Sequence, residues 1–190
     1  MMLKGKLVQL KAVERENLSK YLEWVNDPEV TQYLSPQTRF PKTLAEEHRW
    51  YDNLLKQDDK FVFSIYTRAD DRMIGSVGLH SISWKNQWAI AGIFIGDKDY
   101  WGKGYGTEAF RLCLYIGFQE LGLQRVELGV YAFNERAIKS YQKLGFVEEG
   151  RRRRFLYRNG QFYDEVMMSI LREEYLERYQ KEDEERWKTF

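Results

Sequence analysis

The sequence predicts a mixed α/β fold in which helices flank a mostly antiparallel central sheet. The first half of the chain has the pattern of a strand, two helices and then strands joined by short turns, which is typical of an antiparallel meander. The middle of the chain alternates strand, helix, strand, helix and strand, an order that requires a pair of parallel strands. Together the two patterns predict a single mixed sheet.

Hydrophobic periodicity defines the elements of the first half. Strands are expected at residues 7–12, 61–68, 73–82 and 88–96. Residues 17–25 carry apolar side chains at helical spacing, and residues 43–56 form a second expected helix. That helix opens at Thr43 with Glu46 three residues later, which is the pattern of a capping box.

The second half begins with a long expected helix at residues 104–121. Its polar residues form one stripe, and apolar residues fill the other faces: Glu108, Arg111, Tyr115 and Gln119 make up the stripe. A helix with so wide an apolar surface packs against a sheet. Gly122 is expected to end it in the left-handed conformation.

Further strands and helices follow at residues 125–131, 135–144, 146–157 and 161–170. The shorter helix has Asn134 as its N-cap and ends at Gly145. Asn159 and Gly160 between the last two strands are a strong signal for a two-residue hairpin. We expect a single domain over residues 1–171 and a charged helical tail over residues 172–190.

Composition narrows the class of protein. A length of 190 residues suits one domain, and a net charge of +1 gives no global field that would favour nucleic acid or an anionic membrane. Cys113 is the one cysteine, and His48 and His80 are too few and too far apart for a zinc motif, so no metal site is expected. No secretory leader or segment of transmembrane length occurs, which favours a cytoplasmic protein.

Residues 101–109 carry the clearest functional pattern. They read Trp-Gly-Lys-Gly-Tyr-Gly-Thr-Glu-Ala between an apolar strand and a helix. Glycines let the chain turn tightly and let a phosphate approach the backbone. The first N–H groups of a helix have no partner inside it, and the helix dipole adds positive potential there. The segment therefore predicts a backbone site for a pyrophosphate, although a tight turn that binds nothing would have the same pattern.

Two other phosphate motifs are excluded by spacing. The segment lacks the Gly-Lys-Ser/Thr ending of a P-loop. A dinucleotide fingerprint requires Gly-x-Gly-x-x-Gly after the first strand, whereas Gly102, Gly104 and Gly106 are spaced two and two, midway along the chain.

The segment resembles motif A of the GNAT superfamily of N-acetyltransferases, Gln/Arg-x-x-Gly-x-Gly/Ala, with Gly104 and Gly106 at the two small positions. The residues of this segment are similar to those of one branch of the family, which contains the ribosomal-protein alanine acetyltransferases (RimJ/RimL-like) and the bacterial spermidine acetyltransferases. Trp101 replaces the usual Gln or Arg, a change common in that branch. A second stretch, residues 134–146, resembles the family's Asn-x-x-Ala-x-x-x-Tyr-x-x-x-Gly-Phe. The resemblance covers nearly the whole chain and implies the acyl-CoA N-acyltransferase fold.

The resemblance also implies roles for particular residues. Acetyl-CoA would be the co-substrate, with its pyrophosphate held by the amides of Lys103, Gly104, Tyr105, Gly106 and Thr107. The pantetheine arm would pair with the strand that carries Phe94 and Ile95. Asn134 would face the coenzyme, which is compatible with its being a helix cap.

Tyr141 is the candidate catalytic residue, because a phenol near the leaving sulfur can donate a proton to it. The family's Tyr at this position has that role. The branch often has a Glu on the strand before motif A, but Ile90 stands there in this chain. A water chain, a carboxylate from elsewhere, or His80 on the neighbouring strand would have to act as the base.

The acceptor is the least defined part of the prediction. Candidate walls of its site are Trp24, Asn26, Tyr33, Trp84, Tyr163 and His80. The N-terminal region has many carboxylates, which would suit a cationic polyamine, although charges on helices are usually only solvated: Glu14, Glu16, Glu23, Asp27, Glu29, Glu46 and Glu47. The run of four arginines at residues 151–154 would split between the two faces of a strand.

The expected function is therefore transfer of acetyl from acetyl-CoA to a primary amine by direct attack in a ternary complex. The acceptor is a protein N-terminus or a small molecule, with spermidine or spermine as the alternative. A non-catalytic acyl-CoA-binding module is the alternative from another class. Neither nucleic acid nor a membrane is an expected partner, and the oligomeric state is open, a homo-oligomer included.

Overall fold

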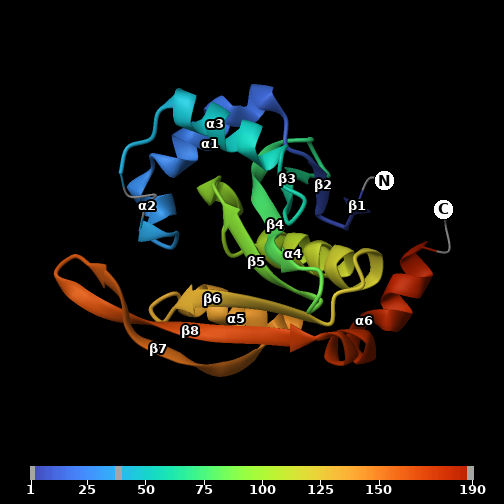
Figure 1. Cartoon of the computed structure of the whole chain (residues 1–190). Helices are drawn as coiled ribbons and strands as arrows, with labels where there is room; N and C mark the ends of the chain where they lie inside the picture. Colours follow the sequence, from blue (N-terminus) through green and yellow to red (C-terminus); the bar gives the residue numbers. More distant parts are fainter. Residues whose placement is uncertain (1–2, 37–39, 188–190) are drawn as a thin grey trace. The chain divides into compact units, whose positions relative to one another are not determined.

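The computed structural model of the chain describes residues 3–36 and 40–187. Among these residues, eight strands hydrogen bond in the order β1-β2-β3-β4-β5-β6-β8-β7 (Figure 1). By its contacts the chain divides into two units, Met1–Ser81 with Gly92–Leu112, and Ile82–Ala91 with Cys113–Phe190. The mixed and mostly antiparallel sheet that the sequence predicts is confirmed.

The first unit contains the N-terminal part of the sheet. Its elements are β1 (Leu3–Lys4), β2 (Val8–Ala12), α1 (Leu18–Val25), α2 (Pro28–Thr31), α3 (Leu44–Leu54), β3 (Phe61–Thr67) and the adjoining parts of β4 (Met73–Ser83), β5 (Trp88–Ile95) and α4 (Tyr105–Tyr115). Each of β1, β2 and β3 pairs antiparallel with the next strand. Helices α1 and α3 lie side by side (Figure 1). Buried side chains of α1, including Leu18, Tyr21 and Trp24, form an apolar cluster with Val30 and Met73.

The second unit contains the parallel pair. The start of β5 runs parallel to β6 (Arg125–Tyr131), and β6 pairs antiparallel with β8 (Gln161–Leu171). Strand β7 (Val147–Arg158) forms the edge beside β8, and α5 (Glu135–Leu144) connects β6 to β7. The Asn159-Gly160 hairpin is confirmed, with φ of 52° and 78° at the two turn residues.

Local signals predict most element boundaries correctly. Thr43 and Glu46 form the expected capping box of α3. Gly145 ends α5 in the left-handed conformation, and Gly122 follows the long central helix with φ of 68°. The predicted helical tail is α6 (Arg172–Trp187). Its Tyr175 is fully buried and donates a hydrogen bond to Asp183. None of the described helices is long and apolar enough to cross a membrane.

Three expectations need correction. The short elements β1 and α2 were not predicted, because two and four residues are too few to show a period. The central helix changes to a π-helical turn, Ile116–Glu120, after α4. The predicted polar stripe is partly buried, since Arg111 and Tyr115 are 6% and 8% exposed. Protein covers this helix on nearly every side, so its few polar residues do not mark a wet surface.

Candidate functional site

Residues 101–109, which the sequence predicts to bind a phosphate and which are called the phosphate loop below, contain three glycines in different environments. Gly102 and Gly104 have φ of 72° and 89°, the left-handed region in which a residue with a Cβ is strained. Gly106 lies within α4, where a Cβ would meet Ile95 Cγ1 at 3.4 Å and Ile93 Cδ1 at 3.8 Å. Gly102 and Gly104 thus permit the turn, whereas a Cβ at Gly106 would make ordinary van der Waals contact with β5.

The start of α4 provides the backbone donors that the sequence predicts. The Glu108 N–H donates to the Gly104 carbonyl at 3.0 Å, which closes the first turn. The N–H groups that precede it have no carbonyl four residues back within the helix. With the positive end of the helix dipole, this geometry suits an anion such as the pyrophosphate of a coenzyme.

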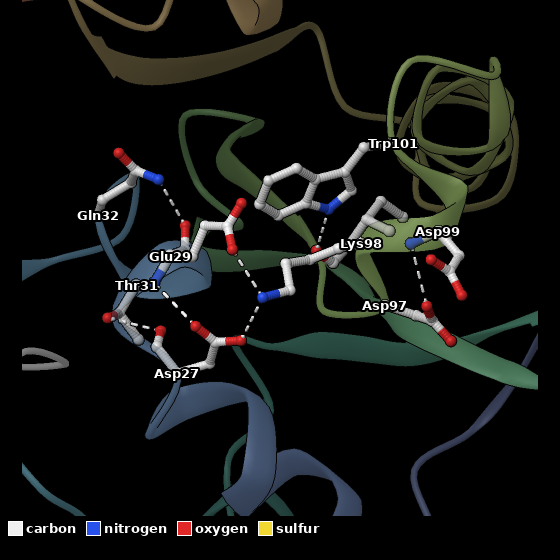
Figure 2. A network of polar contacts seen from close by, with 9 residues as sticks. Asp27, Glu29, Thr31, Gln32, Asp97, Lys98, Asp99 and Trp101 are labelled. Atoms are coloured by element: carbon white, nitrogen blue, oxygen red, sulfur yellow. Dashed lines mark hydrogen bonds and ion pairs between the residues drawn. The ribbon is translucent and has the colours of Figure 1, made fainter.

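Trp101 connects the loop to the end of β5. Its indole Nε1–H donates to the Ile95 carbonyl at 2.7 Å (Figure 2). Its ring meets the Tyr33 ring edge-on at 6.3 Å between centroids. Trp101 therefore supports the loop through β5. The Ile95 carbonyl accepts this bond and retains a second lone pair for another donor.

Lys98, three residues before Trp101, binds two carboxylates of the α2 region. Its Nζ lies 3.0 Å from Asp27 Oδ2 and 2.7 Å from Glu29 Oε2 (Figure 2). The hydrogen bond from Lys98 lowers the pKa of Asp27, and the bond to Glu29 is the largest cause of a raised pKa at Lys98. Asp27 Oδ1 also accepts the Glu29 N–H at 2.8 Å and caps α2. The network joins α2 to the segment that precedes the phosphate loop.

The candidate acceptor residues of the first unit have clear packing roles. Trp24 is buried, and its indole lies directly on Gly96, where a Cβ would come within 2.1 Å of the ring. The Phe94 ring meets both the Trp24 ring and the Tyr21 ring at 6.1 Å. Asn26 is bound to the Lys42 backbone in both directions, at 3.0 and 2.7 Å. Their part in binding an acceptor stays a prediction.

His80 lies beside β5, the strand on which Ile90 stands where the resembled branch often has a glutamate. A Cβ on Gly92 would lie 3.7 Å from His80 Nε2, so the ring covers β5 at that residue. Side chains alternate along a strand, so Ile90 and Phe94 share the face of β5 to which Gly92 belongs. Burial lowers the pKa of His80, and the positive charge of Lys60 lowers it further. The ring is therefore neutral near pH 7 and able to accept a proton.

Asn134 and Tyr141 belong to α5 of the second unit. Asn134 Oδ1 accepts the Ala137 N–H at 3.3 Å, which confirms its role as N-cap. Burial raises the pKa of Tyr141 to about 12, so its phenol stays protonated at any ordinary working pH. Its ring lies 5.9 Å from that of Phe146.

Other predicted residues of the second unit lie on its surface and hairpin. Trp84 is 47% exposed, and the Tyr163 ring packs against Phe133 at 4.9 Å. The arginines at residues 151–154 are exposed, but Arg151 pairs with Glu148 and Arg152 with Glu165. A register shift between Arg152 and Leu156 breaks the simple alternation that was expected there.

Neither a metal site nor a reactive thiol is present in the part of the chain that the structure describes. No group of three metal-ligating side chains occurs among these residues. Cys113 is completely buried, and burial raises the pKa of its thiol to about 12. A thiol in this environment is a poor nucleophile.

A left-handed glycine turn between a strand and the start of a helix, within a mixed sheet, fits the class of acyl-CoA N-acyltransferases. A family model for the acetyltransferase (GNAT) domain matches residues 8–147. The chain belongs to this family and is an acetyl-CoA-dependent N-acetyltransferase that transfers acetyl to an amine.

Individual relatives agree with this assignment. The probable N-acetyltransferase YjcK of Bacillus subtilis is 39% identical over 122 residues, 64% of this chain and 67% of the relative. The spermidine N(1)-acetyltransferase of Escherichia coli K12 is 31% identical over 169 residues, 89% of this chain and 88% of the relative. The crystal structure of spermidine N-acetyltransferase from Vibrio cholerae in complex with CoA and spermine has a TM-score of 0.82 at 26% identity, covering 90% of this chain and 99% of that one.

Proposed function

We propose that the acceptor is a small polycationic amine of the polyamine class, acetylated on a primary amino group. The observation that carries this proposal is likeness over nearly the whole chain, in sequence and in fold, to enzymes named for spermidine. A protein N-terminus is the second candidate, because a putative ribosomal N-acetyltransferase, YdaF of Bacillus subtilis, is 29% identical over 90% of the chain.

Glu47 gives independent support for a cationic acceptor. This carboxylate on α3 is partly buried, and burial raises its pKa. Among the described residues no hydrogen bond or ion pair reaches its carboxylate, and the charge of Lys42, which pairs with Glu46, offsets only part of the effect of burial. Its charge acts on the Tyr21 phenol, and the Tyr21 ring lies 6.1 Å from that of Phe94 on β5. A carboxylate partly withdrawn from water gains most from binding an ammonium group.

The coenzyme residues of the proposal follow the geometry of the loop. The amides of Lys103, Gly104, Tyr105, Gly106 and Thr107 would bind the pyrophosphate, while Phe94 and Ile95 would line the pantetheine arm. Asn134 would add a contact from the start of α5. This binding would use the backbone of the loop alone. The Lys103 side chain is exposed and is not needed for it.

The chemical step is direct transfer. The neutral amine attacks the thioester carbonyl, the new C–N bond forms, and the C–S bond breaks with the sulfur leaving as a thiolate. Tyr141 would donate a hydrogen bond to that sulfur, which its protonated phenol allows. His80, with its lowered pKa, would accept the proton that the amine loses. The buried Cys113 thiol makes an acetyl-cysteine intermediate unsuitable.

The test is release of free thiol from acetyl-CoA with a panel of amines. We expect kcat/KM to be higher for spermidine and spermine than for peptides with a free N-terminus or for amino sugars. Glu47→Gln should raise the KM for spermidine about fivefold and leave the KM for acetyl-CoA unchanged. Glu16→Gln, which removes an exposed carboxylate from the same region, is the matched control. A peptide preference, or equal effects of the two variants, would reject the polyamine proposal.

A further inference from the structure

Glu108 of α4 binds a turn from the opposite end of the sequence. Its carboxylate accepts the backbone N–H groups of Lys6 at 2.7 Å, Leu7 at 2.7 Å and Val8 at 2.8 Å. These residues belong to the connection between β1 and β2, whose turn is closed by the Gly5 N–H and the Val8 carbonyl at 2.7 Å. Hydrogen bonds to a carboxylate are about twice as strong as those between neutral groups.

Glu108 lies in the first turn of α4, near the C-terminal end of the phosphate loop. A carboxylate in the first turn of a helix is normally attracted to the free N–H groups of that same helix. Here its oxygens are occupied by three donors from another segment. The carboxylate of Glu108 is therefore bound to the β1–β2 turn and not to the start of its own helix.

The bound turn also touches the loop. Leu7 Cδ1 lies 3.7 Å from the point where a Cβ on Gly104 would stand. Leu7 makes this contact although its side chain is 39% exposed. The three hydrogen bonds thus hold an apolar side chain beside the turn of the loop.

Gly5 has no side chain, which leaves room for the Glu108 carboxylate beside the turn. A Cβ at Gly5 would lie 2.4 Å from both Cδ and Oε2 of Glu108. The atoms in the way are the end of a flexible side chain, so Gly5→Ala would displace the carboxylate and leave the backbone of the turn in place. Lys6, in contrast, contributes only its backbone N–H to the contact.

We propose that Glu108 is a positioning residue for coenzyme binding. By holding the turn at residues 5–7 against the phosphate loop, it fixes the conformation in which the backbone of the loop would bind the pyrophosphate. This inference rests on the assignment of the loop to the coenzyme in the proposed function. It predicts an effect on the nucleotide end of acetyl-CoA and none on the acetyl group.

The experiment compares acetyl-CoA with S-acetylpantetheine, which has the same thioester but no phosphate. Glu108→Gln should raise the KM for acetyl-CoA about tenfold and leave its kcat unchanged. The KM for S-acetylpantetheine should not change. Gly5→Ala should have at least as large an effect, because the displaced negative charge remains near the pyrophosphate. Lys6→Ala keeps the amide and should leave both KM values as they are.

The outcomes separate the two assignments. A wild-type enzyme with the same KM for both donors would reject the phosphate-loop assignment and this inference with it. A wild-type preference for acetyl-CoA that survives in both variants would reject the role of Glu108 alone. So would a loss of thermal stability together with an equal fall in kcat for both donors, which is the signature of a purely structural contact. If Glu108→Gln does not fold, Gly5→Ala carries the test, since it leaves α4 unchanged.

Discussion

The phosphate loop and the α5 segment would serve one reaction by different physical means. The loop presents main-chain N–H groups, and its distinctive residues are glycines with φ of 72° and 89°. The α5 segment presents side chains, the Asn134 amide and the Tyr141 phenol, on a regular helix with a standard cap. One region is defined by backbone conformation and the other by functional groups.

This difference decides which substitutions matter in each region. Where the backbone binds, truncating a side chain removes little, and adding a Cβ to a left-handed residue changes a great deal. Where a hydroxyl acts, removal of a single oxygen is enough to affect the chemistry. The following predictions test that contrast.

The largest effect is expected at Tyr141. Tyr141→Phe keeps the ring and removes the hydroxyl, so kcat should fall about a hundredfold, with the KM for acetyl-CoA changed little. Steady-state thiol release measures both constants. A variant with undiminished kcat across the pH range would remove Tyr141 from the mechanism.

Gly104→Ala should come next. A Cβ at φ of 89° costs about 1 kcal/mol or more of strain, and the loop would shift to relieve it. The KM for acetyl-CoA should rise about tenfold with kcat nearly unchanged. Gly122→Ala is the matched control, because it also places a Cβ at positive φ, 68°, with nothing within 4 Å. Equal KM values in the two variants would contradict a binding role for the loop.

The pH dependence of kcat should show no titration of the phosphate loop or of the α5 segment below about pH 11. Main-chain amides do not titrate, and burial raises the pKa of Tyr141 to about 12, so the donor form persists as pH rises. An acid limb is expected from His80 and the amine, since burial lowers the pKa of His80 and protonation at low pH removes the base. A basic limb near pH 9 in kcat that disappears in Tyr141→Phe would show that the phenol is not shielded as the structure indicates.

Lys103→Ala should have the smallest effect. The side chain is exposed, and only the amide is needed in the proposed site. The KM for acetyl-CoA should change by about twofold or less at moderate salt, because screening weakens an exposed charge. Titration of CoA by calorimetry would detect a larger loss, which would mean that the loop binds through charge as well as backbone.

Local signals carried most of the fold prediction. The capping box at Thr43, the Asn159-Gly160 turn and the left-handed Gly145 depend on residues within a few positions of one another, and all three were predicted correctly. The parallel pair of β5 and β6 followed from the order of elements. The burial of Arg111 did not, because amphipathic reasoning assumes that polar residues on a helix face water.

Contacts between distant residues could not be predicted in the same way. Glu108 was part of an expected polar stripe, yet it binds amides at residues 6–8, about a hundred positions earlier. The ion pairs of Lys98 with Asp27 and Glu29 join residues that are about seventy positions apart in the sequence. No periodicity or motif predicts which residues form such pairs, because the chain contains many lysines and amides that could bind any one carboxylate.

The sequence by itself predicted the family and the coenzyme correctly, and it proposed the phosphate loop and the candidate acid Tyr141, because short motifs with fixed spacing indicate backbone conformation and functional groups directly. The tertiary structure decided what surrounds those motifs. It placed His80 over Gly92, directed the Trp101 indole to the Ile95 carbonyl and bound Glu108 to the β1–β2 turn. These contacts depend on how the strands and helices pack, and packing is a property of the whole chain.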